Sequence, residues 1–380
     1  MPFTPLSEEE LRDTVACVEQ HLGNRTKAAS VLGINRRTVN DRLKRAARLG
    51  IAPGHFERGV APGYAMGKVT IHRDGDGTIK NTWERQSPDE ELTVQLIEAA
   101  VTGMLNRVTP RKPVKAPASS EEKLLTQYCF TDYHMNMLAW HAEGGANWDL
   151  EIAKDVAARS LEYLVSASPA AGTGVILIQG DWQHYDSMTP VTPTSKHPVD
   201  AAARAQQGID ASMETIELMV HMALQKHARV ILQICEGNHD IYTSMMLRKA
   251  FARLYRDEPR IEVPDEPTPF YAIQFGSTAL FYHHGHKKNW RDLPMVFADK
   301  FAKIWGNTLY RYGNTGHYHH EKVEEFNGIK MMQHPTMAAN DSHASHGGYN
   351  SLREMHATTF HKDFGKSSDI TVNPAMLGMS

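Results

Sequence analysis

Five short clusters of aspartate, asparagine and histidine stand out between residues 132 and 319 of this 380-residue chain. Carboxylate, amide and imidazole groups bind metal ions of intermediate hardness, such as Mn²⁺, iron or Zn²⁺, and the clusters contain no cysteine thiolate. Metal or acid–base chemistry is therefore the first expectation. The clusters are Asp132-Tyr133-His134, Gly180-Asp181-Trp182-Gln183-His184, Gly237-Asn238-His239-Asp240, His283-His284-Gly285-His286 and Gly316-His317-Tyr318-His319.

The number of donors favours two ions over one. Seven ligands are too many for a single site that keeps open positions, whereas two ions that share a carboxylate leave room for water. Two ions about 4 Å apart can clamp a phosphoryl group and lower the pKa of a bridging water. We expect two divalent ions, preferably Mn²⁺, with iron, Zn²⁺, Ni²⁺ or Co²⁺ as alternatives. The candidate ligands are Asp132, His134, Asp181, Asn238, His284, His317 and His319.

The order Asp-x-His, Gly-Asp-x-x-His, Gly-Asn-His-Asp, His-Gly and Gly-His-x-His resembles the motif series of the calcineurin-like metallophosphoesterase superfamily, over about residues 123–335. The resemblance implies a double β-sheet sandwich flanked by helices. It also implies that Asp181 bridges the ions and that His239 protonates the leaving oxygen. By motif position, the first ion takes Asp132, His134, Asp181 and His319, and the second takes Asp181, Asn238, His284 and His317.

One position departs from the Ser/Thr protein phosphatases of this superfamily. They carry Asp three residues after the motif-two Asp, where this chain has His184. A histidine here is similar to the Mre11-type nucleases, in which it assists the catalytic histidine. We therefore expect His184 to orient His239. His239 can act as the acid that protonates a poor alkoxide leaving group, and this favours cleavage of a phosphodiester. Asp186 and Asp240 are expected to be structural, with Asp240 at the start of a helix.

The first three clusters follow apolar runs that are typical of strands. Residues 230–234 are almost continuously apolar, as in a strand covered on both faces. Residues 125–130 and 175–179 end in the same way, and ligands of α/β sheets bind at the carboxyl ends of strands. Helical patterns at residues 148–165 and 201–226 alternate with these runs, so the expected fold class is α/β.

A basic segment near the N-terminus has the pattern of a small all-α helix-turn-helix domain. Ser7 and Glu10 form a capping box for a first helix. Thr26 is expected to open a second helix that ends at Gly33, and Asn35 to cap a third over residues 36–49. Two short helices joined at a glycine, the second of them basic, are typical of this motif.

Residues 23–44 closely resemble the Fis-type helix-turn-helix, which implies DNA binding and, because one motif reads a half-site, a homodimer. Residues 22–48 hold eight Lys/Arg against one acidic residue. That charge favours DNA over the alternative, a dimerisation domain with a solvated basic face. The expected DNA contacts are Arg36, Arg37, Asn40, Lys44 and Arg45, with Asn24 and Thr26 near phosphates.

We expect three parts along the chain. Residues 1–50 form the Fis-like DNA-binding domain, and residues 121–380 form the metallophosphoesterase domain. Residues 51–120 form a connector with a β-hairpin around Asp74-Gly75-Asp76-Gly77, an amphipathic helix at residues 90–105 and a Pro/Lys linker. The whole combination resembles phosphoesterases of tailed phages and prophages.

Composition favours a globular protein, and the cysteine usage a reducing cytoplasm, which the resemblance to phage proteins implies is that of a bacterial host cell. Apolar residues make up 41% and charged residues 22%, with a net charge of −3. Cys17, Cys129 and Cys235 fit neither a zinc motif nor a disulfide framework. The sequence carries no signal-peptide pattern and no apolar run of about 18 residues, so no membrane partner is expected.

Several polar positions near the clusters have two interpretations. His283 and His320 are expected to face away from the site by strand alternation. His286 either lines the site or lies on a surface loop. The polar loop at residues 186–197 is a candidate substrate lid.

The favoured function is a dinuclear-metal-dependent phosphodiesterase, a DNA nuclease held on its substrate by the N-terminal module. One alternative is a phosphatase or phosphodiesterase that acts on nucleotides or phosphoproteins. Another is a DNA-binding regulator with a metal-binding domain. The sequence leaves the metal, the preferred DNA structure and the polarity of cleavage open.

Overall fold

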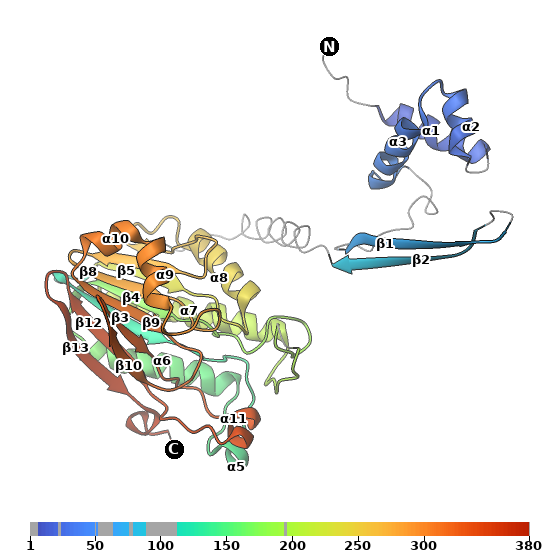
Figure 1. The fold of residues 1–380 in the computed structure, drawn as a ribbon. Coiled ribbons are helices and arrows are strands. Elements are labelled where there is room, and N and C mark those ends of the chain that lie inside the picture. The colour runs from blue at the N-terminus through green and yellow to red at the C-terminus, as the bar shows by residue number, and fades with distance from the viewer. Residues whose placement is uncertain are drawn as a thin grey trace. The chain divides into compact units, whose positions relative to one another are not determined.

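The computed structural model describes residues 7–21, 24–49, 51, 64–75, 79–88, 112–193 and 196–379. The chain divides into two compact units, Met1–Thr102 and Gly103–Ser380, whose elements are labelled in Figure 1. Among the described residues, no helix has the length and apolar character needed to cross a membrane.

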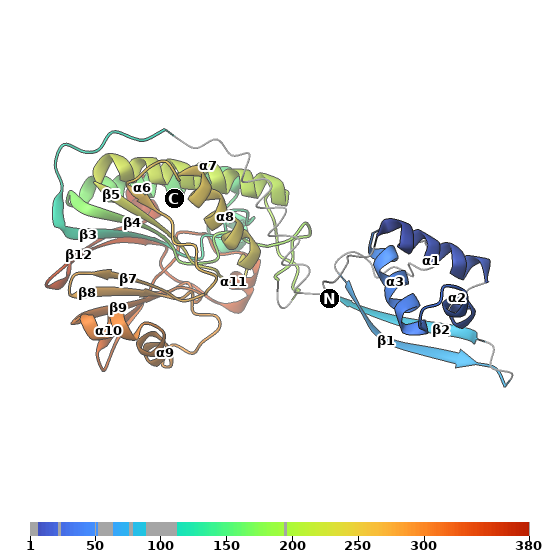
Figure 2. The same ribbon diagram turned by 90° about the horizontal axis from the view of Figure 1, so that it is seen from above.

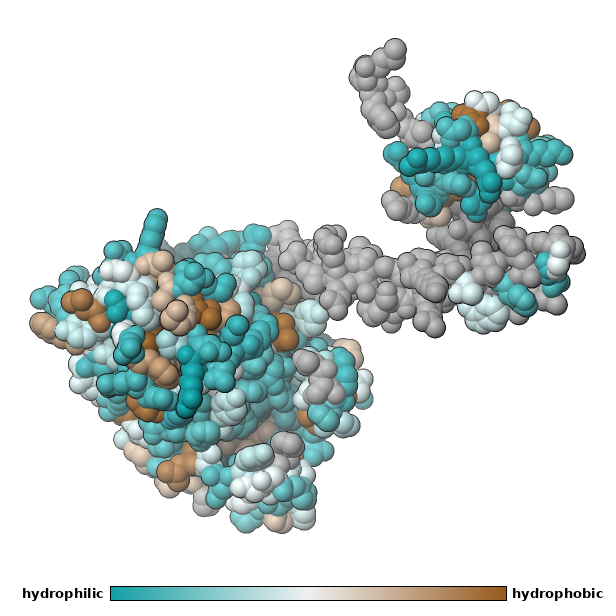
Figure 3. Space-filling model, viewed as in Figure 1, coloured by the Kyte–Doolittle hydropathy of each residue, from teal (hydrophilic) through white to brown (hydrophobic). Residues whose placement is uncertain are grey.

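The first unit begins with three short helices, α1 (Glu8–Gln20), α2 (Arg25–Val31) and α3 (Arg36–Arg48). The capping box of Ser7 and Glu10 at α1 is present, and Asn35 caps α3 by accepting from the Thr38 amide at 2.7 Å. Helix α2 begins one residue earlier than expected, because the Asn24 side chain caps it. The described surface of these helices is mainly hydrophilic in the view of Figure 3.

A small apolar core holds the three helices together. Its buried residues include Leu11, Val15 and Val18 of α1, Ala28 and Ala29 of α2, and Val39 and Leu43 of α3. These residues recur at helical spacing, so each helix has one apolar stripe and one polar face. The packing leaves the basic face of α3 in solvent.

The first unit also contains the expected β-hairpin. Strand β1 (Tyr64–Arg73) pairs antiparallel with β2 (Ile79–Pro88). The amphipathic helix expected at residues 90–105 lies outside the described residues.

The second unit contains two β-sheets, and Figure 2 shows them as adjacent layers with helices on both outer faces. The first sheet has the order β13-β12-β3-β4-β5-β6 and the second β10-β11-β9-β8-β7. The first consists of β3 (Glu121–Phe130), β4 (Ala171–Ile178), β5 (Arg229–Ile234), β6 (Ile261–Glu262), β12 (Met355–His361) and β13 (Gly365–Val372). The second consists of β7 (Tyr271–Phe275), β8 (Thr278–Tyr282), β9 (Tyr310–Thr315), β10 (Lys322–Phe326) and β11 (Ile329–Gln333).

Helices cover the outer face of each sheet, as Figure 2 shows. On the first sheet lie α6 (Leu150–Ala167), α7 (Ala205–Lys226) and α8 (Ile241–Leu254), and on the second lie α9 (Leu293–Lys300) and α10 (Ala302–Asn307). Two short helices, α5 (His141–Gly144) and α11 (Ser342–Gly347), and a 3-10 turn at Pro374–Leu377 complete the unit. The expected double β-sheet sandwich flanked by helices is confirmed.

Three hydrophobic cores fill the spaces between these layers. Ile176 and Ile178 of β4 point to the helices of the first sheet, whereas Val175 and Leu177 point to the second sheet. Strand β8 alternates in the same way between the second sheet's two faces. Strands β3, β4 and β5 are therefore buried on both sides, which explains their continuous apolar runs. Cys129 and Cys235 are free thiols in the middle core.

The parallel pairing of the central strands determines where the polar clusters lie. Strands β3, β4 and β5 run parallel, as do β8 and β9. Each cluster directly follows the carboxyl end of one of these five strands. Parallel strands end at the same edge of their sheet, so the clusters from both sheets reach one edge of the sandwich.

Candidate metal centre

The structure brings together side chains from all five clusters. Three groups, each with three donor atoms within 4.8 Å of one another, could hold a metal ion. One of them, His134, His184 and His239, comes from the first sheet alone, and the other two consist of expected metal ligands. The first of these two is Asp132, His134 and His319, and the second is Asp181, His284 and His317. Each of these two groups combines donors from the first sheet with donors from the second. The centre therefore exists only when the sandwich is assembled.

Asp132 lies at the middle of the first group. Its Oδ1 is 3.3 Å from His319 Nε2, and its two carboxylate oxygens accept from the His317 amide at 3.0 and 2.9 Å. His134 Nε2 lies 3.5 Å from His319 Nε2. Thr131 Oγ1 donates to Asp132 Oδ2 at 2.5 Å. These contacts fix the Asp132 carboxylate, which follows β3, against the loop that follows β9.

His284 connects the two groups. Its Nε2 lies 3.1 Å from Asp181 Oδ2 and 3.7 Å from Asp132 Oδ1. Its Nδ1 lies 2.9 Å from the Gln179 carbonyl, so Nδ1 carries the hydrogen and Nε2 faces the carboxylates. This arrangement leaves one imidazole nitrogen directed to the space between the two aspartates.

The backbone at this edge is unusual. The described non-glycine residues with left-handed backbone are Asp132, His134, Asp181, Lys196, His317 and His319, with φ between 48° and 74°. Five of these six are expected metal ligands. Left-handed backbone is disfavoured for residues with a side chain, and such strain persists where the surrounding structure imposes it, often at functional sites. The sequence gives no direct sign of it.

Two glycines allow the cluster loops to approach each other closely. A Cβ at Gly237 would lie 1.9 Å from Asp181 Oδ1, and a Cβ at Gly316 would lie 1.9 Å from Thr131 Oγ1. Any larger residue would push the loops after β4 and β5, or after β3 and β9, apart. The glycines of the third and fifth motifs are therefore required by the space around the ligands.

The charges within the centre favour a cation. Burial opposes ionisation of Asp132, but the neighbouring His319 and His284 hold the pKa of its carboxyl below the ordinary value. Burial would lower the pKa of His284, but Asp181 and Asp132 raise that pKa to about 10. The two buried carboxylates thus create a strongly negative site, which a divalent ion would neutralise.

Unpaired polar atoms at the same place also fit a metal. Asn238 Oδ1 is buried and has no hydrogen-bond partner among the described residues. Burial, reinforced by the imidazoles of His239 and His184, lowers the pKa of His134 well below the ordinary value, and the neutral imidazole is the form that binds metals. The donors are oxygens and imidazoles, which suit divalent ions of intermediate hardness. The residues present therefore fit the expected group.

His239 lies at the rim of the centre, and its contact with His184 differs from the expectation. His239 Nδ1 bonds to the backbone carbonyl of His184 at 2.8 Å, not to its imidazole. The two rings are stacked, with centroids 5.7 Å apart. The His184 ring instead places Nδ1 3.3 Å from His134 Nδ1. His184 therefore orients His239 through its main chain, a role that the side-chain identity at this position does not reveal.

Asp240 and Asp186 both make structural contacts, as expected, but the partners of the two carboxylates were not expected. Asp240 precedes α8, yet its side chain makes no capping bond there. Its carboxylate accepts from the amides of Asp181, Trp182, Gln183 and Gly237 at 2.8–3.2 Å and so joins two cluster loops. Burial, then the charges of Asp181 and Asp186, raise the pKa of Asp240 to about 7.

The start of α8 is capped by Asp186 instead. Its carboxylate accepts from the Tyr242 amide at 2.6 Å and from the Thr243 amide at 2.8 Å. Asp186 is thus a structural residue that anchors the loop after β4 to α8. The remainder of the loop at residues 186–197 is described except for residues 194 and 195, and its role as a lid stays a prediction.

The other histidines of the clusters differ in burial and in the groups that they contact. His283 is buried and stacks on Phe270 at 4.5 Å, as expected for a packing residue. His286 lies beside the centre, 5.4 Å from the ring of His284, and both of its ring nitrogens are buried without a partner among the described residues. His320 is exposed, with Nδ1 2.8 Å from the Tyr318 carbonyl.

The expected DNA contacts lie together on α3. Arg36, Arg37, Lys44 and Arg45 are exposed, while Asn40 is partly buried. Asn40 Oδ1 accepts from Arg25 Nη1 of α2 at 2.9 Å, so this asparagine also connects the two helices of the motif. The four exposed cations are available for contacts with phosphates.

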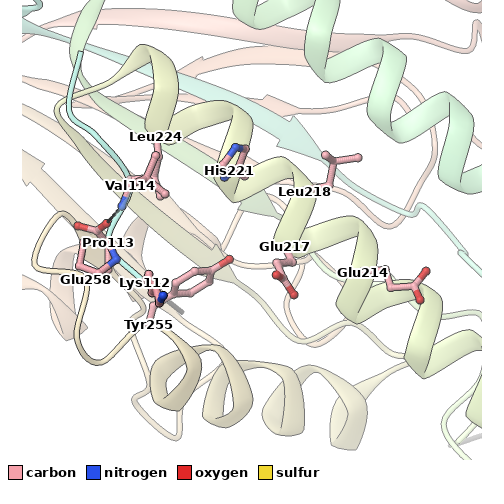
Figure 4. Close-up of a pocket in the computed structure, with 10 residues that line it drawn as sticks. All are labelled: Lys112, Pro113, Val114, Glu214, Glu217, Leu218, His221, Leu224, Tyr255 and Glu258. Atoms are coloured by element: carbon pink, nitrogen blue, oxygen red, sulfur yellow. Dashed lines mark hydrogen bonds between the residues drawn. The ribbon is translucent and has the colours of Figure 1, made fainter. Parts of the chain in front are cut away.

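A cavity of about 660 Å³ lies away from the metal centre, where the described chain resumes at Lys112 (Figure 4). Val114, Leu218 and Leu224 supply apolar walls, and Glu214 and Glu217 project from α7. None of the expected site residues lines this cavity. The expected chemistry therefore belongs to the strand-end edge and not to this cavity.

Comparison with solved structures finds similar chains of low identity. An archaeal phosphodiesterase is 12% identical with a TM-score of 0.32, covering 65% of this chain and 99% of its own. Vacuolar Protein Sorting 29 from Cryptosporidium parvum is 10% identical with a TM-score of 0.31, covering 67% and 97%. A Streptococcus pneumoniae protein described as a predicted phosphoesterase is 12% identical with a TM-score of 0.28, covering 66% and 98%.

Comparison with curated proteins finds no match. The family model described as "Bacterial regulatory protein, Fis family" matches residues 15–45. Those residues extend from the second half of α1 to α3 and include the exposed cations. The N-terminal segment of this chain is therefore a Fis-type helix-turn-helix.

Proposed function

We propose that this protein is a dinuclear-metal-dependent phosphodiesterase that acts on DNA. The observation that carries the proposal is the pair of donor groups, Asp132/His134/His319 and Asp181/His284/His317, which share one edge of the sandwich. His284 lies within 3.7 Å of both aspartates, so the groups are adjacent. Adjacent divalent sites open to solvent are suited to phosphoryl substrates.

The ligand assignment follows the two groups. The first ion would take Asp132, His134, Asp181 and His319, and the second would take Asp181, Asn238, His284 and His317. Such ions, preferably Mn²⁺, would supply Lewis-acid activation of the phosphoryl group and of water. The orphaned amide oxygen of Asn238 supports its place in the second set.

His239 is the proposed proton donor to the leaving oxygen. Its Nδ1 contacts a carbonyl oxygen, so Nδ1 keeps its hydrogen in both charge states and the exchangeable proton is carried on Nε2. The His239 amide also donates to Asp181 Oδ1 at 2.8 Å, which keeps this histidine beside the proposed bridging ligand. A positioned acid of this kind contributes most when the leaving group is a poor one, such as the alkoxide of a DNA strand.

The helix-turn-helix supports DNA as the substrate. A module that binds duplex DNA raises the local concentration of phosphodiester bonds at the centre without changing the centre itself. The exposed cations of α3 supply the charge that phosphate contacts need. A homodimer through this module is part of the proposal.

The test combines a metal-loaded activity assay with the His239→Ala variant. We expect Mn²⁺-dependent cleavage of DNA, and a loss of roughly 10²–10⁴-fold in turnover on DNA for His239→Ala. The loss should be much smaller on bis(p-nitrophenyl) phosphate, because p-nitrophenolate leaves without a proton. Metal content should stay unchanged.

His346→Ala is a matched control, because His346 is an exposed histidine of the short helix α11. Its turnover should equal that of the wild type. If the metal-loaded wild type cleaves no single-stranded, duplex or nicked DNA but hydrolyses a nucleotide or a phosphoprotein, the proposal of a DNA phosphodiesterase is wrong.

A further inference from the structure

A row of aromatic rings leads outward from the second donor group. The ring of His284 lies 5.3 Å from that of His317, which lies 4.9 Å from that of Tyr318. His320 continues the row at 6.3 Å from Tyr318. His284 is fully buried, whereas Tyr318 is 58% exposed. Tyr318 therefore presents an aromatic ring to solvent next to a proposed metal ligand.

The position of Tyr318 is fixed by the centre itself. The amide of the preceding His317 donates to both oxygens of Asp132, and the Tyr318 carbonyl is 2.8 Å from His320 Nδ1. Both neighbours of Tyr318 in the chain have left-handed backbone, with φ of 74° and 57°. A large exposed aromatic side chain held in this way is pre-organised to contact a ligand.

The loop that follows β8 adds positive charge on the same side. Lys287, Lys288 and Arg291 are exposed there, directly after His286. The ring of His286 lies 6.2 Å from that of His317, which places the start of this loop beside the Tyr318 segment. Lys287 also forms an ion pair with Glu236 at 2.5 Å, next to the third motif.

A second contact joins these two loops farther from the centre. Lys322, at the start of β10, lies 4.8 Å above the ring of Trp290, and Trp290 Nε1 donates to Glu324 at 3.0 Å. The segment with Tyr318 and the basic loop are therefore packed against each other. Together they form one rim of the centre that combines an exposed aromatic ring with cations.

We propose that Tyr318 is a stacking platform for the base of the nucleotide next to the scissile phosphodiester. This inference rests on the proposed function. Exposed aromatic rings flanked by Lys and Arg bind single-stranded nucleic acid by stacking on bases while the cations contact the backbone. A base inside a duplex is already stacked on its neighbours and cannot lie on Tyr318. The nucleotide at the scissile bond is therefore unpaired, and the substrate class is single-stranded or frayed DNA.

The test uses full-length, Mn²⁺-loaded protein and two dinucleotide substrates. One is thymidylyl-thymidine, and the other is the same phosphodiester with both bases absent. Tyr318→Ala should lower kcat/KM for thymidylyl-thymidine by about tenfold or more, mainly through KM, and leave the abasic substrate unchanged. Tyr318→Phe should keep wild-type values on both, because the ring and not the hydroxyl is used.

Phe364→Ala is the matched control. Phe364 is 70% exposed and stacks on a histidine, His361, but it belongs to the β12–β13 turn. Its kinetic constants should equal those of the wild type on both dinucleotides. Metal content of each variant shows whether the ligands next to Tyr318 are still in place.

Three results would overturn the inference, and a fourth would overturn its basis. An equal loss for Tyr318→Ala on both dinucleotides would mean that Tyr318 only positions His317, as would loss of metal in that variant. Unchanged kinetics of Tyr318→Ala on thymidylyl-thymidine would exclude stacking. A wild type that hydrolyses phosphate monoesters but neither dinucleotide would contradict the proposed diesterase function.

Discussion

The helix-turn-helix and the metal centre both present polar side chains to a ligand, but they are assembled in different ways. On α3 the exposed cations lie within ten residues of one another, and the helix is started by a neighbouring asparagine. At the centre, Asp132 and His319 are 187 positions apart and meet at 3.3 Å only because two sheets pack face to face. One surface depends on local structure and the other on the whole fold.

This difference predicts how each region responds to change. Contacts on α3 are separate, so their contributions should add. The donors of the centre share charges and hydrogen bonds, and their backbone is held in strained conformations by the surrounding loops. Residues that act as a unit give losses that do not add. The substitutions below are ordered from the largest expected effect to the smallest.

Asp181→Asn should have the largest effect. It removes the carboxylate that faces His284 and that the proposal gives to both ions. Loss of metal-based charge stabilisation of several kcal/mol corresponds to about 10³-fold in kcat/KM. Turnover of bis(p-nitrophenyl) phosphate and metal analysis of the purified protein measure the result.

Asp186→Asn is the control for this change. Asp186 is five residues away and caps α8 without touching the donor groups. It should lose some stability but keep its metals and most of its turnover. If both variants lose activity equally, the loss is caused by distortion of the loop after β4 and not by removal of a metal ligand.

The sequence predicted the features whose contacts are local better than those whose contacts depend on the whole fold. The caps at Ser7 and Asn35 and the apolar runs of β3, β4 and β5 were predictable because their causes are local. The grouping of the seven candidate ligands came from the resemblance of their order to a known motif series, and it stays a prediction. The hydrogen-bond partners of Asp240 and Asp186 were not predictable, because these partners lie on segments that are distant in sequence and near only in the fold.

The combined substitution of Arg36, Arg37, Lys44 and Arg45 by Ala should affect DNA binding and not chemistry. Removing up to four phosphate contacts should weaken duplex binding by about tenfold or more at 0.1 M salt and reduce the slope of log K against log salt by about three to four. Fluorescence anisotropy with a labelled duplex measures both. Hydrolysis of bis(p-nitrophenyl) phosphate should be unchanged.

Arg12→Ala controls for charge alone. Arg12 is an exposed cation of α1 with Glu8 at 3.8 Å. It should leave the salt slope near that of the wild type. If Arg12→Ala weakens DNA binding as much per removed charge as the α3 substitutions do, binding depends on the net charge of the domain. In that case α3 is not a distinct contact surface.

Asn35→Ala should have the smallest effect, and this effect should be confined to the helix-turn-helix. It removes the 2.7 Å cap on the Thr38 amide, which costs about 1 kcal/mol of helix stability. Amide hydrogen exchange in α3 of the full-length protein should therefore accelerate by about fivefold where exchange occurs through local opening. Turnover of bis(p-nitrophenyl) phosphate should not change, because the donor groups are held by contacts within residues 112–379. A fall in turnover from this one cap would mean that the order of α3 is coupled to the centre, and the separation between a locally built surface and a fold-dependent one would no longer hold.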